Sequence, residues 1–433
     1  MSDTAIQIQP VKSLDVAISA PPSKAHSLRY IYIAALADGV SRLDHLLLGE
    51  DQQHALNAIR SLGVPVELDE IAGAAAIHGT GGRLQAPDNE LFIGNSGVGI
   101  RFLTPIAALV ADGTVTLTGD ERMCNGRPIA DLLTALAPLG ITASSMRDNG
   151  LPPLLVQGGG IRGGTTHLRG QASSQYFSAI LIAAPFADED VTIHADGEIK
   201  SRPYIDTTIA AMQAFGVTAE VTASGFRVAA GQRYQPLQTA IEGDYSSASY
   251  FFAAAAVTGG KIRVDGLRSD SDQGDRYIVE ALQTMNCHAQ FADDTVELQG
   301  GPLAPIETDM SNYPDLVPTL AVVAAFADGT SVFTGVEHLR IKESDRLAAT
   351  AAQLQRLGAD AEDAGDRLIV RGRAGESMHG ATIETYNDHR LAMAFAIAGL
   401  RVPGVVISNP GCVAKSFPDF FERLADMTAQ DRS

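Results

Sequence analysis

The sequence predicts an α/β protein of two similar domains, each built from three repeat units. One observation is that an apolar helix end, closed by Asp or Gly and followed by a β-rich stretch, returns roughly every 70 to 76 residues. The copies are residues 35–39, 109–113, 185–188, 256–260, 325–329 and, in weaker form, 399–404. A second observation is that a further helix in each complete unit stops at Gly or Asn, the residues that most readily end a helix. These stops are Gly63, Gly140, Gly216, Asn286 and Gly358.

Units of this length usually cannot bury their own apolar faces and must stack on neighbours. An open solenoid is therefore an alternative to closed domains. Within each unit, however, strands alternate with helices, and the units share little sequence identity. Both properties favour packed, closed domains, and six units in one chain suggest two domains of three units.

The domain boundaries follow from where the repeats stop. Residues 235–241 lie between the third and fourth units, so the chain is expected to cross between domains there. A β-rich stretch, residues 6–18, precedes the first unit and is closed by two prolines, which indicates a second crossing. The predicted domains are residues 23–241 and a discontinuous domain of residues 1–22 and 242–433, with the active site in the cleft between them.

Composition narrows the class of protein. A chain of 433 residues with 45% hydrophobic side chains can bury a large core. Its formal net charge of −19 repels nucleic acid and anionic membranes, so an anionic ligand must bind at a local basic cluster. No signal pattern and no apolar run of roughly 18 to 20 residues is present, which predicts a soluble cytoplasmic protein. Three separated cysteines, Cys124, Cys287 and Cys412, lack zinc-ligand spacing and are expected to be reduced.

Basic residues stand where helices are predicted to begin. Arg127, Arg202 and Lys415 each precede a proline, an aspartate and a helix, and Lys342 and Arg346 flank a similar start. Pro and Asp suit the first helical turn, but a cation there opposes the helix dipole. A solvated surface cation would explain any one of these residues. Their recurrence across repeats instead favours binding of phosphate or carboxylate at the helix starts.

Three further stretches have the same character. Residues 22–29 open the first helix and carry Lys24 and Arg29. Residues 94–101 form a glycine-rich join between a strand and a helix, which suits either an oxyanion site or a tight turn. The polar run Ser173-Ser174-Gln175 precedes an apolar helix and by itself would be a cap.

Four phrases together resemble the enolpyruvyl transferases of the 3-phosphoshikimate 1-carboxyvinyltransferase (EPSP synthase) family. They are residues 172–175 (ASSQ), 341–346 (IKESDR), 386–390 (YNDHR) and 414–419 (AKSFPD). The resemblance implies an inside-out α/β barrel in each of two domains, with three βαβαββ units per domain. It also implies closure on substrate, no metal, no organic cofactor, no nucleic-acid or membrane partner, and a monomer.

The resemblance further implies the reaction. The enolpyruvyl group of phosphoenolpyruvate would pass to the 5-hydroxyl of shikimate 3-phosphate through a tetrahedral intermediate, in chorismate and aromatic amino-acid biosynthesis. Glyphosate would act as an inhibitor at the phosphoenolpyruvate site. By motif, that site comprises Lys24, Asn95, Gly97, Arg101, Arg127, Arg346, Arg390 and Lys415. The shikimate 3-phosphate site comprises Arg29, Ser173, Ser174, Gln175, Ser201, Tyr204, Asp315 and Lys342.

Proton transfer needs one group that deprotonates the hydroxyl and another that protonates carbon. Glu343 and Asp315 are the candidates, with Lys24 assisting phosphate departure. Ion pairing would lower the pKa of both carboxylates and desolvation would raise it, and the sequence does not decide between the two effects. His389, beside Arg390, joins the substrate-binding residues, either as a hydrogen-bonding group or as a proton relay.

Some positions depart from the family pattern, and two rival functions follow from the same residues. Val98 and Phe102 stand where Thr and Pro are common, so we expect intermediate glyphosate sensitivity. Ala25 and His338 also differ from the pattern. One rival is the related enolpyruvyl transferase of UDP-N-acetylglucosamine, which has a reactive cysteine before an Arg-Pro pair; Cys124 lies closer to Arg127 than that pattern requires. The other rival is a non-catalytic repeat scaffold that binds anions.

Overall fold

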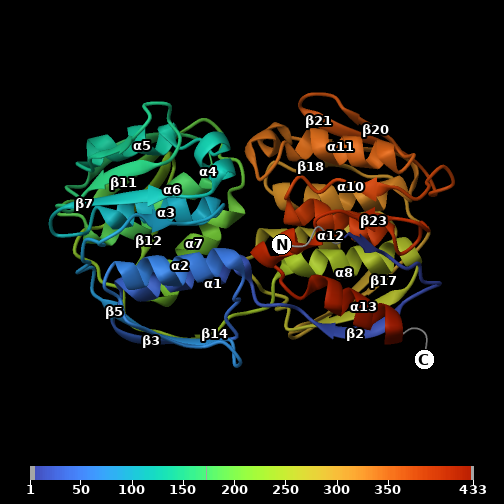
Figure 1. Cartoon of the computed structure of the whole chain (residues 1–433), viewed down its shortest axis with the longest axis horizontal. Helices are drawn as coiled ribbons and strands as arrows, with labels where there is room; N and C mark the ends of the chain where they lie inside the picture. Colours follow the sequence, from blue (N-terminus) through green and yellow to red (C-terminus); the bar gives the residue numbers. More distant parts are fainter. Residues whose placement is uncertain (1–4, 172, 431–433) are drawn as a thin grey trace. The chain divides into compact units, whose positions relative to one another are not determined.

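The chain divides by packing into two compact units in the computed structural model, which describes residues 5–171 and 173–430 (Figure 1). Unit 1 comprises Met1–Ser23 and Glu242–Ser433, and unit 2 comprises Lys24–Ile241. Within the described residues, none of the helices has the length and apolar character needed to cross a membrane.

The predicted alternation of helices and strands is confirmed in unit 2. Each of its three repeats has a buried helix, a strand, a more exposed outer helix and a hairpin. The buried helices are α1 (Lys24–Leu36), α3 (Gly97–Ala107) and α6 (Ser174–Ala183). The outer helices are α2 (Glu50–Ser61), α5 (Ala130–Leu136) and α7 (Pro203–Ala214), with a short α4 (Glu121–Gly126) before α5.

Unit 2 holds three four-stranded sheets of one design. A linking strand lies parallel to the first strand of a repeat, and the other strands pair antiparallel. In order the strands are β14 (Gln238–Ala240), β3 (Asp38–Asp44), β5 (Ala74–Thr80) and β4 (Val66–Asp69); β6 (Leu91–Phe92), β7 (Thr114–Thr118), β9 (Leu154–Gln157) and β8 (Ala143–Ser145); and β10 (Gly164–Arg169), β11 (Val191–Asp196), β13 (Gly225–Val228) and β12 (Ala219–Thr222). Because parallel strands need a crossover, β6 and β10 each lead through a buried helix to their partners.

Unit 1 repeats the pattern in two of its repeats, whereas the third has a three-stranded sheet. Its buried helices are α8 (Tyr245–Thr258), α10 (Val317–Ala325) and α12 (His389–Ala398), and its outer helices are α9 (Tyr277–Thr284), α11 (Arg346–Arg356) and α13 (Phe420–Gln430). Its sheets run β16 (His288–Ala292), β17 (Thr295–Gln299), β15 (Lys261–Asp265) and β2 (Asp15–Ser19); β18 (Glu307–Asp309), β19 (Asp328–Thr334), β21 (Arg367–Arg373) and β20 (Asp360–Asp363); and β1 (Ile6–Gln7), β23 (Val406–Ile407) and β22 (Thr382–Ile383).

The N-terminal segment differs from the single β-rich stretch expected over residues 6–18. It forms two strands in two different sheets, because β1 pairs antiparallel with β23 whereas β2 pairs parallel with β15. Pro10 lies between them, and proline has no N–H to donate to a sheet. The chain then passes from β2 in unit 1 to α1 in unit 2.

The buried helices form the core of each unit because they are apolar on nearly every side. Every residue of α8, α10 and α12 is buried, and these three helices pack against one another in the yellow to red part of the chain (Figure 1). A helix that is hydrophobic all round is stable only inside a protein. In unit 2, α3 packs in the same way on α6 and α1.

The predicted helix stops are confirmed in their backbone conformation. Gly63, Gly140, Gly216 and Gly358 have φ between 84° and 87°, and Asn286 has φ of 69°. Asn occupies this left-handed region more readily than most side chains, which explains why it replaces Gly in one repeat.

Candidate active site

Six charged side chains of unit 1 form a single ion-pair network, here named the unit 1 cluster. It is built at four places where a helix or turn starts or stops: the short turn before α10, the loop and first turn of α11, the start of α12, and the end of the turn before α13. Its members are Asp315, Glu343, Arg346, Asp388, Arg390 and Lys415.

Arg346 lies at the centre of the unit 1 cluster, with its side chain 1% exposed. Its Nη1 donates to Asp315 Oδ1 at 2.9 Å, its Nη2 to Glu343 Oε2 at 2.7 Å and its Nε to Asp388 Oδ2 at 2.9 Å. Burial opposes the charge, but the three carboxylates raise the pKa of Arg346 above its usual range. The guanidinium is therefore charged and held in one orientation.

Asp315 bridges two arginines. Its Oδ1 accepts from Arg346, and its Oδ2 accepts from Arg390 Nη2 at 2.7 Å. Burial acts to raise the pKa of Asp315, but the charges of Arg390, Arg346 and Lys342 hold it well below the usual range. Of the two effects that sequence reasoning left open, ion pairing is the stronger at Asp315.

Glu343 is placed between two cations that reach it from different elements. Its Oε2 accepts from Arg346, and its Oε1 lies 3.2 Å from Lys415 Nζ. The Glu343 side chain is 12% exposed, so it is more accessible than the arginine that it holds. An anion that bound Lys415 would compete directly with this carboxylate.

Asp388 is a site residue that sequence reasoning missed, although the motif containing it was recognised. Its side chain is fully buried, accepts from Ser344 Oγ at 3.1 Å and caps α12 by accepting from the Arg390 N–H at 3.0 Å. One carboxylate thus fixes both Arg346 and the start of α12. The signal in the sequence was an Asp directly before a helical run, which is typical of an N-cap.

His389 and Lys342 lie beside the unit 1 cluster. The His389 ring is buried, with Nδ1 3.8 Å from Asp388 Oδ1. Lys342 ends the turn before α11 and acts on Asp315 through its charge.

In unit 2 the glycine-rich join brings five predicted site residues together. It runs from β6 to α3, and Ser96 caps the helix through its hydroxyl. A Cβ on Gly97 would lie 3.4 Å from Arg101 Nη1 and 3.6 Å from Arg127 Cζ. The other contacts are Arg127 Nε to Asn95 Oδ1 at 3.3 Å and Arg101 Nη1 to Gln175 Oε1 at 2.5 Å. The Gly97 backbone therefore lies beside two guanidinium groups, and a side chain at this position would contact both.

The polar run before α6 adds neutral groups. Ser173 caps the helix by accepting from the Gln175 N–H at 3.3 Å, and Ser174 is buried in its first turn. Ala172, which belongs to the same motif, lies outside the described residues. Gln175 connects this run to the glycine-rich join through its contact with Arg101.

Lys24 and Arg29, both on α1, have strong partners within unit 2. Lys24 Nζ lies 2.8 Å from Asp51 Oδ2, a carboxylate in the first turn of α2 that sequence reasoning missed. Arg29 donates from Nε to Thr208 Oγ1 at 2.8 Å and from Nη2 to the Tyr204 carbonyl at 2.7 Å. Arg29 thus helps to hold the start of α7 in place.

Ser201 and Tyr204 stand at that same start. Ser201 is buried with φ of 55°, and its carbonyl accepts from the Tyr204 N–H at 3.2 Å. The structure therefore groups Arg29, Ser201 and Tyr204, and it groups Gln175 with Arg101.

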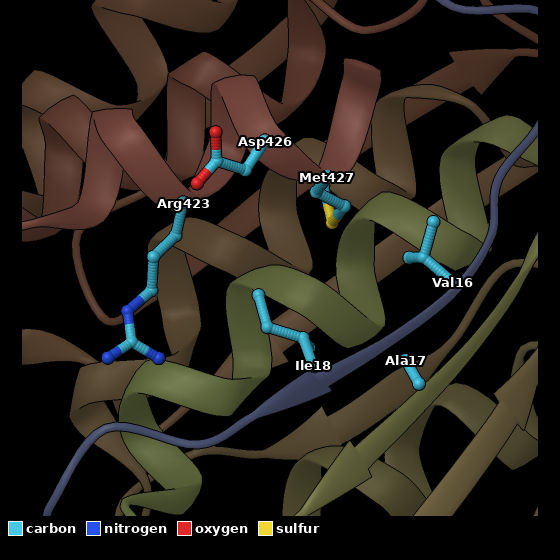
Figure 2. A pocket seen from close by; sticks show the side chains of 6 residues that line it. All are labelled: Val16, Ala17, Ile18, Arg423, Asp426 and Met427. Atoms are coloured by element: carbon cyan, nitrogen blue, oxygen red, sulfur yellow. The ribbon is translucent and has the colours of Figure 1, made fainter. Parts of the chain in front are cut away.

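A cavity of about 160 Å³ lies between β2 and α13 in unit 1 (Figure 2). It is lined by Val16, Ala17, Ile18, Arg423, Asp426 and Met427. Its one cation, Arg423, donates to Asp419 at 2.6 Å and to the Ser19 carbonyl at 2.9 Å, which explains its presence structurally. None of the predicted site residues lines this cavity.

Comparisons with known proteins agree with one another. Residues 8–424 match the model of the family described as EPSP synthase (3-phosphoshikimate 1-carboxyvinyltransferase). The 3-phosphoshikimate 1-carboxyvinyltransferase of Methanothermobacter thermautotrophicus is 43% identical over 413 residues, covering 95% of this chain and 96% of its own. The enzyme of the same name from Shewanella sp. strain W3-18-1 is 39% identical over 425 residues, covering 98% and 99%. A solved EPSP synthase from Acinetobacter baumannii superimposes with a TM-score of 0.81 at 29% identity, covering 98% of this chain and 97% of its own.

Proposed function

Because the chain belongs to the EPSP synthase family, we propose that basic side chains in both of its units bind the anionic groups of the family's two substrates. The enzyme has the two-domain inside-out α/β fold and transfers the enolpyruvyl group of phosphoenolpyruvate to shikimate 3-phosphate, in aromatic amino-acid biosynthesis. The assignments of individual residues below are our proposal.

Phosphoenolpyruvate carries a phosphate and a carboxylate, and guanidinium and ammonium groups suit both. In unit 1 we assign these groups to Arg346, Arg390 and Lys415, with His389 beside them. In unit 2 we assign them to Lys24, Arg101 and Arg127, together with Asn95 and Gly97 of the glycine-rich join. The supporting observation is that Asp388 and Asp315 hold Arg346 and Arg390 in fixed orientations through charge-assisted hydrogen bonds. Such preorganisation reduces the ordering cost of binding.

Shikimate 3-phosphate is a polyol with a phosphate and a ring carboxylate, and it therefore needs neutral donors and acceptors as well as cations. The residues that we assign to it are Arg29, Ser173, Ser174, Gln175, Ser201, Tyr204, Asp315 and Lys342. Gln175 is hydrogen-bonded to Arg101, so the two proposed substrate sites share a boundary in unit 2.

Glu343 is the group that we assign to proton transfer, together with Asp315. In the addition step the 5-hydroxyl oxygen bonds to C2 of phosphoenolpyruvate and loses its proton, while C3 gains one. In the elimination step C3 gives up a proton and the C2–O bond to phosphate breaks. Substrate phosphate that binds Lys415 removes a cation from Glu343, which raises the proton affinity of that carboxylate. Lys24 offsets the charge of the departing phosphate.

The observation that carries the proposal is the position of Glu343, which bridges a fully buried arginine and a lysine from a separate element. A non-catalytic anion-binding scaffold needs no group that transfers protons, so replacement of Glu343 distinguishes the two functions. We also propose that the protein is a cytoplasmic monomer and that glyphosate binds at the phosphoenolpyruvate site.

Phosphate release tests the proposed acceptor. The intact protein is incubated with phosphoenolpyruvate and either shikimate 3-phosphate, UDP-N-acetylglucosamine or no acceptor. We expect release only with shikimate 3-phosphate. Release with the UDP-sugar alone would contradict the proposal in favour of the related transferase, and no release at all would favour a scaffold.

Arg127→Met tests the proposed binding role. Loss of a charge-assisted contact should raise the KM for phosphoenolpyruvate by about tenfold or more. Arg147→Met is the matched control, since Arg147 also lies in unit 2 and donates to Asn125 and to two carbonyls. An unchanged KM in Arg127→Met would remove this residue from the site.

A further inference from the structure

The segment between β22 and α12, residues 384–388, has an unusual backbone. Tyr386 and Asn387 are consecutive and both lie in the left-handed region, with φ of 52° and 55°. Side chains with a Cβ avoid this region, and an aromatic residue there is rarer than Asn. Such a conformation persists only where surrounding contacts impose it. The contacts that impose it are therefore informative.

Helix α11 holds this segment at two points. At its first residue, Arg346 donates to Asp388. About two turns further along the same side of the helix is Gln353, which is 2% exposed. Its Oε1 accepts from the Glu384 N–H at 2.9 Å, and its Nε2 donates to the Tyr386 hydroxyl at 3.2 Å. The two contacts by Gln353 and the two by Arg346 fix both ends of residues 384–388.

The segment is held at a third point by the residues after β23. Asn409 donates from Nδ2 to Asn387 Oδ1 at 3.0 Å and itself has φ of 44°. It precedes the 3₁₀ turn Pro410–Lys415, which ends at the cation that pairs with Glu343. The strained segment thus connects the three elements that carry Arg346, Arg390 and Lys415.

We infer that Gln353 is a positioning residue for the phosphoenolpyruvate anion site, acting through residues 384–388 on Asp388 and hence on Arg346 and Arg390. The inference rests on the proposed role of those two arginines in binding phosphoenolpyruvate. The two side-chain hydrogen bonds described for Gln353 go to Glu384 and Tyr386, which are not among the predicted site residues. No sequence motif includes it, and its place on α11 alone would suggest an ordinary core position.

The physical argument concerns what happens when the amide is lost. Met has nearly the volume of Gln, so Gln353→Met keeps the packing and removes both hydrogen bonds. The Glu384 N–H then loses its acceptor, and a buried donor without an acceptor is unfavourable. The segment can recover by relaxing Tyr386 and Asn387 out of the left-handed region. That movement displaces the Asp388 carboxylate, and the guanidinium that it orients moves with it.

The experiment compares four variants of the intact enzyme by steady-state kinetics and thermal melting. Gln353→Met should raise the KM for phosphoenolpyruvate about tenfold, the equivalent of one lost hydrogen bond to a charged site. The KM for shikimate 3-phosphate should stay within about twofold, and kcat within about threefold, because the lost interaction is one of binding. Tyr386→Phe removes only the hydroxyl contact and should give a smaller rise of the same kind.

Gln355→Met is the matched control. Gln355 lies on the same helix, one residue beyond Leu354, and its amide donates to the Ala361 carbonyl at 2.7 Å. It should lower the melting temperature without changing either KM. Arg390→Met is the reference for direct loss of a binding cation and should raise the KM for phosphoenolpyruvate more than Gln353→Met does.

Each outcome has a definite meaning. A rise in the KM for phosphoenolpyruvate in Gln353→Met and Tyr386→Phe, absent from Gln355→Met, supports the inference. Equal effects on both substrates, or an effect that tracks melting temperature across all variants, would overturn it. If Arg390→Met leaves the KM unchanged, the proposed function of the cluster fails independently. If Gln353→Met does not fold, an unchanged KM in Tyr386→Phe is enough to reject the role.

Discussion

Replacement of Glu343 by Gln separates proton transfer from binding. The amide has the shape of the carboxylate but cannot hold the transferred proton at neutral pH. If Glu343 is a general acid or base, turnover should fall by about 10²- to 10⁴-fold, which corresponds to roughly 3 to 5 kcal/mol in the activation free energy. The KM for phosphoenolpyruvate should not rise, because Arg346 and Lys415 lose a carboxylate that competes for them.

The structure also bounds the effect on stability. After the change, Arg346 still has Asp315 and Asp388, so its charge remains compensated. We therefore expect a cost of about 1 to 2 kcal/mol, below the 3 to 5 kcal/mol typical of breaking an isolated buried pair. In a unit of this size that lowers the melting temperature by about 2 to 8 °C. Most of the enzyme stays folded at assay temperature.

The assay is the initial rate of phosphate release over a matrix of both substrates, with melting temperature measured on the same samples. Asp363→Asn is the control, since Asp363 accepts from Arg340 at 2.6 and 2.9 Å in the same unit. It should lose comparable stability and keep its turnover. Full turnover in Glu343→Gln would refute the assignment. A raised KM with unchanged kcat would make Glu343 a binding residue instead.

Three further predictions concern pH, inhibition and shape. Burial, with a smaller effect of Asp315, raises the pKa of Asp275 to about 6, so its ionisation opposes folding as the pH rises from about 4 to 6. Asp275→Asn should therefore raise the free energy of unfolding by up to about 3 kcal/mol at pH 8 and by little at pH 4. If the melting temperatures of variant and parent differ by the same amount at both pH values, the prediction is wrong. Val98→Thr restores the residue common in the family and should lower the glyphosate inhibition constant while keeping the KM for phosphoenolpyruvate within about threefold; equal inhibition constants in parent and variant would show that Val98 does not weaken glyphosate binding. Phe102→Pro is not a useful second change, because Phe102 is fully buried beside Tyr32 and Arg29 and its loss costs about 3 to 5 kcal/mol. Saturating shikimate 3-phosphate with a phosphoenolpyruvate analogue should reduce the radius of gyration in solution scattering if both units contribute to one site, and an unchanged radius would count against it.

Local features of the fold could be predicted from the sequence because they depend on neighbouring residues. The stop at Asn286 is an example, since a left-handed residue after a helix favours Gly or Asn wherever the helix packs. The start of α1 at Lys24 follows in the same way from the two prolines that precede it. The two strands in residues 6–18 could not be separated, because their partners, β23 and β15, lie hundreds of residues away in sequence.

In the candidate site, too, only the features that depend on neighbouring residues in the sequence could be predicted. Cations at helix starts could be found because they oppose the dipole, and Arg346 and Arg202 do stand at the starts of α11 and α7. Arg390 was identified only through the family motif. The counterions of the site cations could not be found by the same reasoning. Asp388 looks like a simple cap from its neighbours, and Asp51 like a favourable first-turn acid. That each also holds a cation depends on packing between helices, which no local pattern reports.

The placement of β1 and β2 has a consequence for synthesis on the ribosome. Unit 2 is one continuous stretch whose three sheets close internally, so it can fold as soon as residue 241 has emerged. The strands β1 and β2 are made first, but β15 and β23 are made much later. At 5 to 20 residues per second, β2 waits roughly 10 to 50 s for its partner. For that time β2 is an unpaired edge strand on a growing chain, and unit 2 can complete its folding only near the end of the wait, because Ile241 precedes β15 by about 20 residues.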